Sequence, residues 1–205
     1  MVEEGGLQST ASEFTQAMHS ISNTDIQLRQ IDHLTLIRIE VDPDSQAAQR
    51  MQEVLGVKFP QDPGQVTGDR QAVEILYGTR QIVACLRAEQ ATFLVVSQVD
   101  AVKLGRALSL ALGDGPGLVL DVSANRSVLE LSGPAAGQVL AQTVTFENSP
   151  PYFSQGMAFK CGVAQAEMML WRIGQDQYLL VPRSSSTAPV LTSMLDVIAQ
   201  FKKTC

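Results

Sequence analysis

The chain has 205 residues, of which 45% are hydrophobic, enough to fill the core of one large domain or two small ones. Its formal net charge is -6 and its 15 lysines and arginines are scattered, which argues against a surface for nucleic acid or anionic lipid. Its three cysteines, Cys85, Cys161 and Cys205, lie too far apart in the sequence to indicate a zinc site or a disulfide framework.

The N-terminal residues carry little sign of a core. Residues 1–25 are rich in Ser, Thr, Gly and Gln, so we predict a flexible arm or short helix that orders on a partner, followed by one folded domain over 26–205. The start, Met1–Gly6, is acidic and no apolar run follows it, so no secretory signal is expected. Charged residues interrupt the apolar stretch Val99–Gly113, which makes a membrane helix improbable. We therefore expect a cytoplasmic protein.

The folded part begins with a predicted strand over Leu34–Val41. Asp42-Pro43-Asp44 is expected to stop this strand and to cap a helix, because a carboxylate accepts hydrogen bonds from free helix N–H groups and proline suits a first turn. Gly56 should end that helix. The apolar positions that predict its buried face are Ala47, Ala48, Met51, Val54 and Leu55.

A loop rich in Pro and Gly is predicted over Lys58–Asp69, before a set of strands and a second helix. The strands are predicted over Ala72–Tyr77 and Gln81–Leu86, joined by a hairpin turn at Gly78-Thr79, and over Thr92–Ser97. The second helix is indicated by apolar residues at Val99, Val102, Leu104, Leu108, Leu110 and Leu112, and it ends before Gly113–Gly117.

The rest of the chain repeats this order. Ser127–Leu131 predicts a strand, Ser132-Gly133-Pro134 a stop and cap, and Ala135–Gln142 a helix. After a loop over Glu147–Gln155, the predicted elements are strands over Met157–Ala164, Glu167–Arg172 and Gln177–Val181 and a helix from about Thr187 to Lys203.

The sequence thus predicts an α+β fold with two similar strand-helix-strand-strand-strand-helix halves, over about 26–117 and 118–205. Pro43 aligns with Pro134, and Phe93–Ser97 aligns with Tyr178–Pro182. Gene duplication and chance similarity are both open as its origin. A split β-α-β arrangement would fit each half.

Several residues are candidates for sites of chemistry. Gly113–Gly117 follows a helix and precedes a strand, the reverse of a phosphate-binding loop, so a turn is favoured. His19 and His33 have no third metal ligand near them in sequence. Cys161 follows Lys160, but neighbours in a strand point to opposite faces, so a buried thiol is favoured. Helix capping explains Ser132 and the run Ser184–Ser186, since neither lies in a nucleophile elbow.

Two further pairs stay open between structural and interaction roles. Asp121 and Arg126 could pair with each other or contact a partner. Trp171, beside Arg172, could anchor a partner or pack in the core. We assign no catalytic, cofactor-binding or metal-binding residue.

Four segments carry a family resemblance that spans about Leu28 to Phe201. They are Asp121-Val122-Ser123-Ala124-Asn125-Arg126-Ser127, Leu131-Ser132-Gly133-Pro134-Ala135-Ala136, Trp171-Arg172 and Tyr178–Ser184. With these segments the chain resembles the gamma-subunit family of heterotetrameric sarcosine oxidases, within the wider group of aminomethyltransferase-like folate-binding domains.

The resemblance implies a non-catalytic subunit without a cofactor of its own. It implies that FAD, FMN, NAD, tetrahydrofolate and zinc belong to the alpha, beta and delta subunits, and that this chain braces the large alpha subunit. The implied complex oxidises sarcosine to glycine, passes the one-carbon unit to tetrahydrofolate and reduces oxygen to peroxide.

Three alternatives stay open. Where the family has a Gly-Pro-Asp-Glu-Trp-like entry to its third strand, this chain has Arg87–Phe93, so the complex could be an N-methylglutamate dehydrogenase or another N-methyl amino acid oxidising enzyme. A free-standing folate-binding or aminomethyltransferase-like protein and a generic interaction module are the others. For a subunit, the high apolar content predicts an exposed hydrophobic patch that a larger partner covers.

Overall fold

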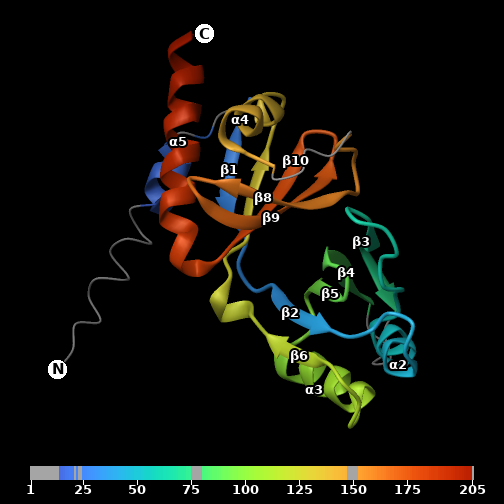
Figure 1. Cartoon of the computed structure of the whole chain (residues 1–205). Helices are drawn as coiled ribbons and strands as arrows, with labels where there is room; N and C mark the ends of the chain where they lie inside the picture. The colour runs from blue at the N-terminus through green and yellow to red at the C-terminus, as the bar shows by residue number, and fades with distance from the viewer. Residues whose placement is uncertain (1–13, 21, 23–24, 75–79, 147–151, 205) are drawn as a thin grey trace, which may run out of the picture. The chain divides into compact units, whose positions relative to one another are not determined.

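The computed structural model describes residues 14–20, 22, 25–74, 80–146 and 152–204 (Figure 1). They form two compact units. Unit 2 consists of Asp32–Arg126 and Gly156–Phe159, and unit 1 of the described residues within Met1–Ile31, Ser127–Gln155 and Lys160–Cys205. None of the helices in the described ranges combines the length and the apolar composition of a membrane-spanning segment.

Unit 2 is a five-stranded antiparallel sheet with two helices. The strand order is β3-β4-β5-β2-β6. Its elements are β2 (Thr35–Glu40), α2 (Gln46–Leu55), β3 (Val66–Glu74), β4 (Arg80–Glu89), β5 (Thr92–Ser97), α3 (Ala101–Leu112), β6 (Leu118–Asp121) and the 3-10 turn η1 (Ser123–Asn125).

The core of unit 2 lies between its sheet and its two helices. Ile37 and Ile39 of β2 alternate with Arg38, so one face of the strand carries the apolar side chains. Met51 of α2 and Leu104 of α3 pack in the same cluster, so both helices contact this face of the sheet.

The cap of α2 differs from the sequence prediction. Ser45 is the N-cap, because its Oγ accepts a hydrogen bond from the N–H of Ala48 at 3.1 Å. The Asp42 carboxylate accepts a hydrogen bond from the N–H of Asp44 instead. Asp42 lies about one turn before the helix and so does not cap it. Gly56 ends α2 with a left-handed φ of 68°, as predicted.

Two other predictions for this unit are corrected. β3 begins at Val66, inside the predicted loop Lys58–Asp69. Val102 and Leu110, expected among the apolar positions of α3, are 77% and 74% exposed, because α3 turns only the stripe through Leu104 and Leu108 toward the sheet. The predicted hairpin turn Gly78-Thr79 lies outside the described residues.

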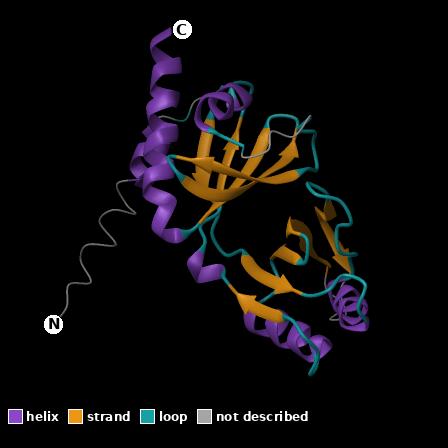
Figure 2. Ribbon diagram, viewed as in Figure 1, coloured by secondary structure: helices purple, strands orange, loops and turns teal. Residues whose placement is uncertain are grey.

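Unit 1 has a sheet of the same kind. The strand order is β1-β7-β10-β9-β8. Its elements are a helical segment over 14–20, β1 (Gln27–Gln30), β7 (Leu129–Ser132), α4 (Ala136–Thr143), β8 (Ala158–Val163), β9 (Ala166–Gly174), β10 (Gln177–Pro182), the 3-10 turn η2 (Ser184–Ser186) and α5 (Thr187–Thr204). Figure 2 distinguishes the helices, in purple, from the strands, in orange.

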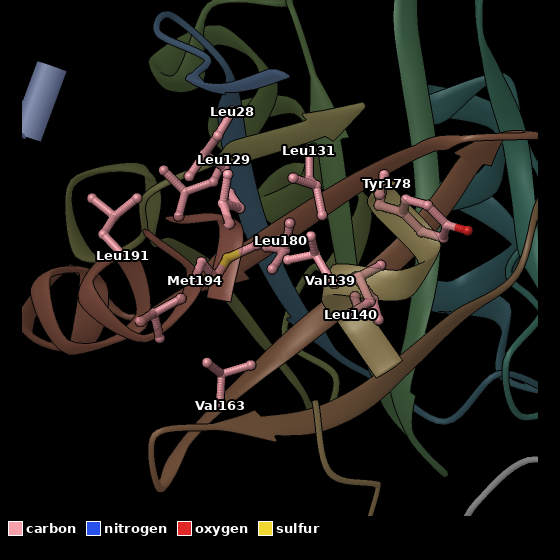
Figure 3. Packing of buried hydrophobic residues seen from close by; sticks show 14 of the residues in the cluster. Leu28, Leu129, Leu131, Val139, Leu140, Val163, Tyr178, Leu180, Leu191 and Met194 are labelled. Carbon is pink, nitrogen blue, oxygen red and sulfur yellow. The ribbon is translucent and has the colours of Figure 1, made fainter. Parts of the chain in front are cut away.

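The core of unit 1 is a cluster of aliphatic side chains from the sheet and from α4 and α5 (Figure 3). Leu129 and Leu131 of β7 and Leu180 of β10 meet Val139 of α4 and Met194 of α5 there. Met18 of the helical segment 14–20 is buried in the same cluster. Part of the predicted arm therefore packs on unit 1, while residues 1–13 lie outside the described residues.

Ser132 does not cap α4, contrary to the sequence prediction. It is the last residue of β7, and the N-cap of α4 is Ala135, whose side chain makes no capping bond. Gly133 has a φ of 113° and turns the chain between the strand and the helix. Ser184–Ser186 forms η2, which runs directly into α5.

The predicted strand-helix-strand-strand-strand-helix order is present twice, in β2-α2-β3-β4-β5-α3 and in β7-α4-β8-β9-β10-α5. Each sheet also has one short strand whose limits the sequence pattern does not predict. β1 precedes β2 in the chain but pairs with β7, and β6 precedes β7 but pairs with β2. The observed units therefore differ from the predicted halves 26–117 and 118–205, because β1 belongs to the sheet of unit 1 and β6 to the sheet of unit 2. The origin of the repeat stays a prediction.

Candidate functional site

The candidate residues named from sequence mostly serve the local structure. In the loop Gly113–Gly117, the N–H of Gly113 donates to the carbonyl of Ser109 and ends α3, and the loop then leads into β6. The helix-loop-strand order expected of a turn is present.

The histidines are separate and exposed. His19 lies in the helical segment 14–20 of unit 1, and His33 lies before β2 in unit 2 with a φ of 63°. Within the described ranges, no group of three or more His, Cys, Asp or Glu side chains is placed to hold a metal ion.

The two described thiols are buried. Burial raises the pKa of Cys161 to about 12, and burial raises the pKa of Cys85 still further above its ordinary value. Lys160 is exposed while Cys161 is buried, as alternation along β8 requires. Both thiols are therefore protonated and poorly nucleophilic at neutral pH. Cys205 lies outside the described residues.

Asp121 orders the turn that follows β6. Its Oδ1 accepts from the N–H of Ser123 at 2.9 Å and from the Ser123 hydroxyl at 2.5 Å. The same hydroxyl accepts from the N–H of Leu36 at 2.9 Å and so ties η1 to β2. The proposed pairing of Asp121 with Arg126 stays a prediction.

Trp171 and Arg172 are part of unit 1's β9. Trp171 is 4% exposed and lies opposite Leu179 of β10, which favours packing over a surface anchor. Its Nε1 is buried without a hydrogen-bond partner among the described residues. Arg172 donates to the carbonyls of Phe153 and Gln175, each at 2.7 Å, and its guanidinium lies over the ring of Tyr178. Arg172 therefore joins β9 to the segment at Phe153 and to the turn at Gln175.

Unit 2 also has a shallow hollow at the surface, of about 330 Å³. It is lined by Asp42, Pro43, Asp44, Gln61, Arg87, Gln90 and Ala91. The guanidinium of Arg87 donates to the carbonyl of Gln90 at 2.9 Å, so it holds the adjacent turn together. The Asp42 carboxylate accepts from the N–H of Asp44, so it too serves a local turn.

The surface feature that sequence reasoning missed is the edge of unit 2. Leu118 and Leu120 of β6 are 40% and 44% exposed on a strand that ends its sheet. Other large exposed apolar residues are Val102, Leu110 and Tyr152. The sequence predicts an exposed hydrophobic patch without placing it, and four residues are too few to identify β6 as an edge strand; the patch itself stays a prediction.

Comparison with known proteins identifies the family. The family profile described as sarcosine oxidase, gamma subunit family, matches residues 78–199. The chain is 33% identical over 195 residues to the sarcosine oxidase subunit gamma of Corynebacterium sp. (strain P-1), covering 95% of this chain and 91% of the relative. It is 30% identical over 203 residues to that of Arthrobacter sp., covering 98% and 95%.

Solved structures match the fold of this chain. The heterotetrameric sarcosine oxidase from Corynebacterium sp. U-96, in complex with pyrrole 2-carboxylate, contains a chain that matches with a TM-score of 0.81 at 29% identity, covering 93% of this chain and 94% of that one. The glycine cleavage system aminomethyltransferase T from Bartonella henselae matches with a TM-score of 0.60 at 16% identity, covering 89% of this chain and 48% of that one, which shows a shared fold alone. The α+β fold predicted from the sequence is thus confirmed, and the chain belongs to the sarcosine oxidase gamma subunit family.

Proposed function

We propose that this chain is the non-catalytic gamma subunit of a heterotetrameric sarcosine oxidase. The observation that carries the proposal is the agreement over almost the full length of both chains, at 33% identity with one gamma subunit and a TM-score of 0.81 with a chain of the solved heterotetramer. An agreement of this extent supports equivalence to the whole subunit, not to a domain borrowed from it.

The proposed partners are the alpha, beta and delta subunits, chiefly the large alpha subunit, in the cytoplasm. The complex would oxidise sarcosine to glycine and transfer the one-carbon unit to tetrahydrofolate. In this proposal FAD, FMN, NAD, tetrahydrofolate and zinc are held by the partner subunits.

The state of the reactive side chains supports a structural role. Cys85 and Cys161 are buried and protonated, because burial raises the pKa of each. Asp121 and Arg172 are committed to turns within their own units. A group that already serves a turn would have to break those hydrogen bonds to act on a substrate.

The experiment is co-expression of the chain with the flavin-dependent and dinucleotide-binding subunits encoded beside it. The purified complex should contain this chain and should form peroxide with sarcosine, whereas the chain alone should be colourless and inactive. A matched preparation that lacks the chain should lose activity or stability.

Each other outcome points to a different function. Activity with N-methylglutamate in place of sarcosine would assign the subunit to a sister complex. Tight binding of tetrahydrofolate by the isolated chain would favour a free-standing folate-binding protein. Full activity of the complex without the chain would overturn the proposal.

A further inference from the structure

The two sheets are equivalent strand by strand. The order β6-β2-β5-β4-β3 in unit 2 corresponds to β1-β7-β10-β9-β8 in unit 1. The registers also correspond, because core-facing Ile39 lies opposite Val119, and core-facing Leu131 lies opposite Leu28. Each residue of β6 therefore has a counterpart on β1.

The counterparts differ on the face that points away from the helices. β1 has Gln27 and Arg29 there, whereas β6 has Leu118 and Leu120. On β1 the fold holds polar residues at these positions, with Arg29 paired to Glu130 on the neighbouring strand. Exposed leucines on β6 carry a cost in water and gain nothing for the core, so they indicate a surface that another chain covers.

The backbone of β6 is also open on its outer side. The N–H of Val122 donates to the carbonyl of Leu36 at 2.8 Å. In an antiparallel pair of strands, only every second residue bonds to the neighbouring strand. Val119, three residues before Val122, therefore points its N–H and C=O away from β2. On β1 the corresponding N–H, that of Leu28, donates a hydrogen bond to the Ser22 hydroxyl oxygen at 3.3 Å. In the described part of the chain, no strand lies beyond β6.

The charges around β6 indicate which segment would fit. Asp121 lies at one end of the strand, and Asp114 lies in the loop before the other end, both exposed. Arg38 and Glu40, which lie opposite the two leucines on β2, form an ion pair at 2.5 Å and so offset each other. The edge is thus an apolar strip with acidic ends.

We propose that β6 accepts an extended segment of a partner subunit as a sixth strand of this sheet. The segment would carry apolar side chains at two alternate positions, to cover Leu118 and Leu120, and a lysine or arginine beyond them, to meet Asp121 or Asp114. Main-chain hydrogen bonds to Val119 would supply affinity, and the alternating side chains would supply specificity. This inference rests on the proposed function, which supplies the partner.

The test uses variants of the full chain co-expressed with its partner subunits. Leu118→Gln with Leu120→Gln gives β6 the polar character of β1 without placing an arginine opposite Arg38, and should leave folding intact. With Val119→Ala as the control for the lost side chain, which packs against the core of unit 2, Val119→Pro removes an outward N–H, which an edge strand tolerates. The double variant and Val119→Pro should each lower the recovery of this chain in the complex by about tenfold or more. Val102→Gln, which removes a more exposed apolar residue on α3, is the matched control and should have no effect.

Hydrogen exchange supplies a readout specific to strand addition. The amide of Val119 should exchange slowly in the complex and quickly in the free chain. If the wild-type chain fails to assemble, the proposed function fails and this inference with it. If the wild-type chain assembles and the β6 variants assemble equally well, or the Val119 amide stays unprotected, the inference alone is overturned. An equal loss with Val102→Gln would also overturn it.

Discussion

Gly133 lies against the carbonyl group of Asp25. A Cβ atom built on Gly133 would come within 2.3 Å of the Asp25 oxygen, and the residue has a φ of 113°. The N–H of Ala135 donates to the same carbonyl at 3.1 Å, so the segment before β1 is joined to the start of α4 at this point. The oxygen belongs to backbone that a side chain cannot displace cheaply.

We therefore expect Gly133→Ala and Gly133→Val to destabilise the chain by roughly 1–3 kcal/mol from backbone strain, with the clash added to it. Gly156→Ala is the matched control, since Gly156 has a similar φ of 85° and nothing within 4 Å of the added Cβ. Urea unfolding measures both. Equal losses for the two glycines would contradict the role of the Asp25 contact.

Ser45→Ala should lower the free energy of unfolding by about 1 kcal/mol, because it removes the oxygen that accepts from the N–H of Ala48. Asp44→Ala should have a much smaller effect, since Asp44 is exposed and lies outside the helix. Thermal or urea unfolding distinguishes the two. A larger loss of unfolding free energy for Asp44→Ala than for Ser45→Ala would contradict Ser45 as the cap and favour the segment Asp42-Pro43-Asp44 predicted from the sequence.

Arg29 and Glu130 should be coupled in stability. The Arg29 guanidinium lies 3.1 Å from both carboxylate oxygens of Glu130, whose side chain is 3% exposed. Arg29→Gln should cost roughly 1–3 kcal/mol, because the buried carboxylate loses a charged partner. A double-mutant cycle with Glu130→Gln measures the coupling.

The exposed pair Arg38 and Glu40 gives the matched comparison. The Arg38 and Glu40 side chains are 46% and 40% exposed, so their coupling should be below about 1 kcal/mol. Equal coupling in the two cycles would show that burial of Glu130 does not strengthen its pair.

Cys161 should make stability fall at alkaline pH. Its folded pKa is about 12, above the ordinary 9.0, so above pH 9 the unfolded chain releases a proton that the folded chain keeps. This contribution is complete below pH 9 and is lost as the pH rises toward about 12. Urea unfolding from pH 8 to 10.5 should therefore show a shallower decline for Cys161→Ala than for the wild-type chain. Parallel declines would indicate that this thiol is accessible to solvent.

The strands and helices with long periodic patterns could be predicted from the sequence. The strand predicted over Thr92–Ser97 has the observed limits, since five apolar or β-branched residues, Thr92–Val96, lie between turn residues. β1 and β6 could not be predicted, because four residues are too few to show a period. Their partners lie in the sheet of the other half, which sequence order does not reveal.

The candidate surface was harder to predict for the same reason. Val102 and Leu110 have the composition of core residues, and only the observed rotation of α3 identifies them as exposed. Leu118 and Leu120 are identified as a candidate surface only by the strand order, which places β6 at the edge of its sheet and β1 at the equivalent edge of the other. Motif resemblance found the family, but the position of an interface depends on tertiary pairing.

The most direct test of the central proposal is native mass spectrometry of the co-expressed complex. We predict a species whose mass includes one copy of this chain with the flavin-dependent and dinucleotide-binding subunits, and which oxidises sarcosine. A complete and active complex of the other subunits from which this chain is absent would contradict the proposal.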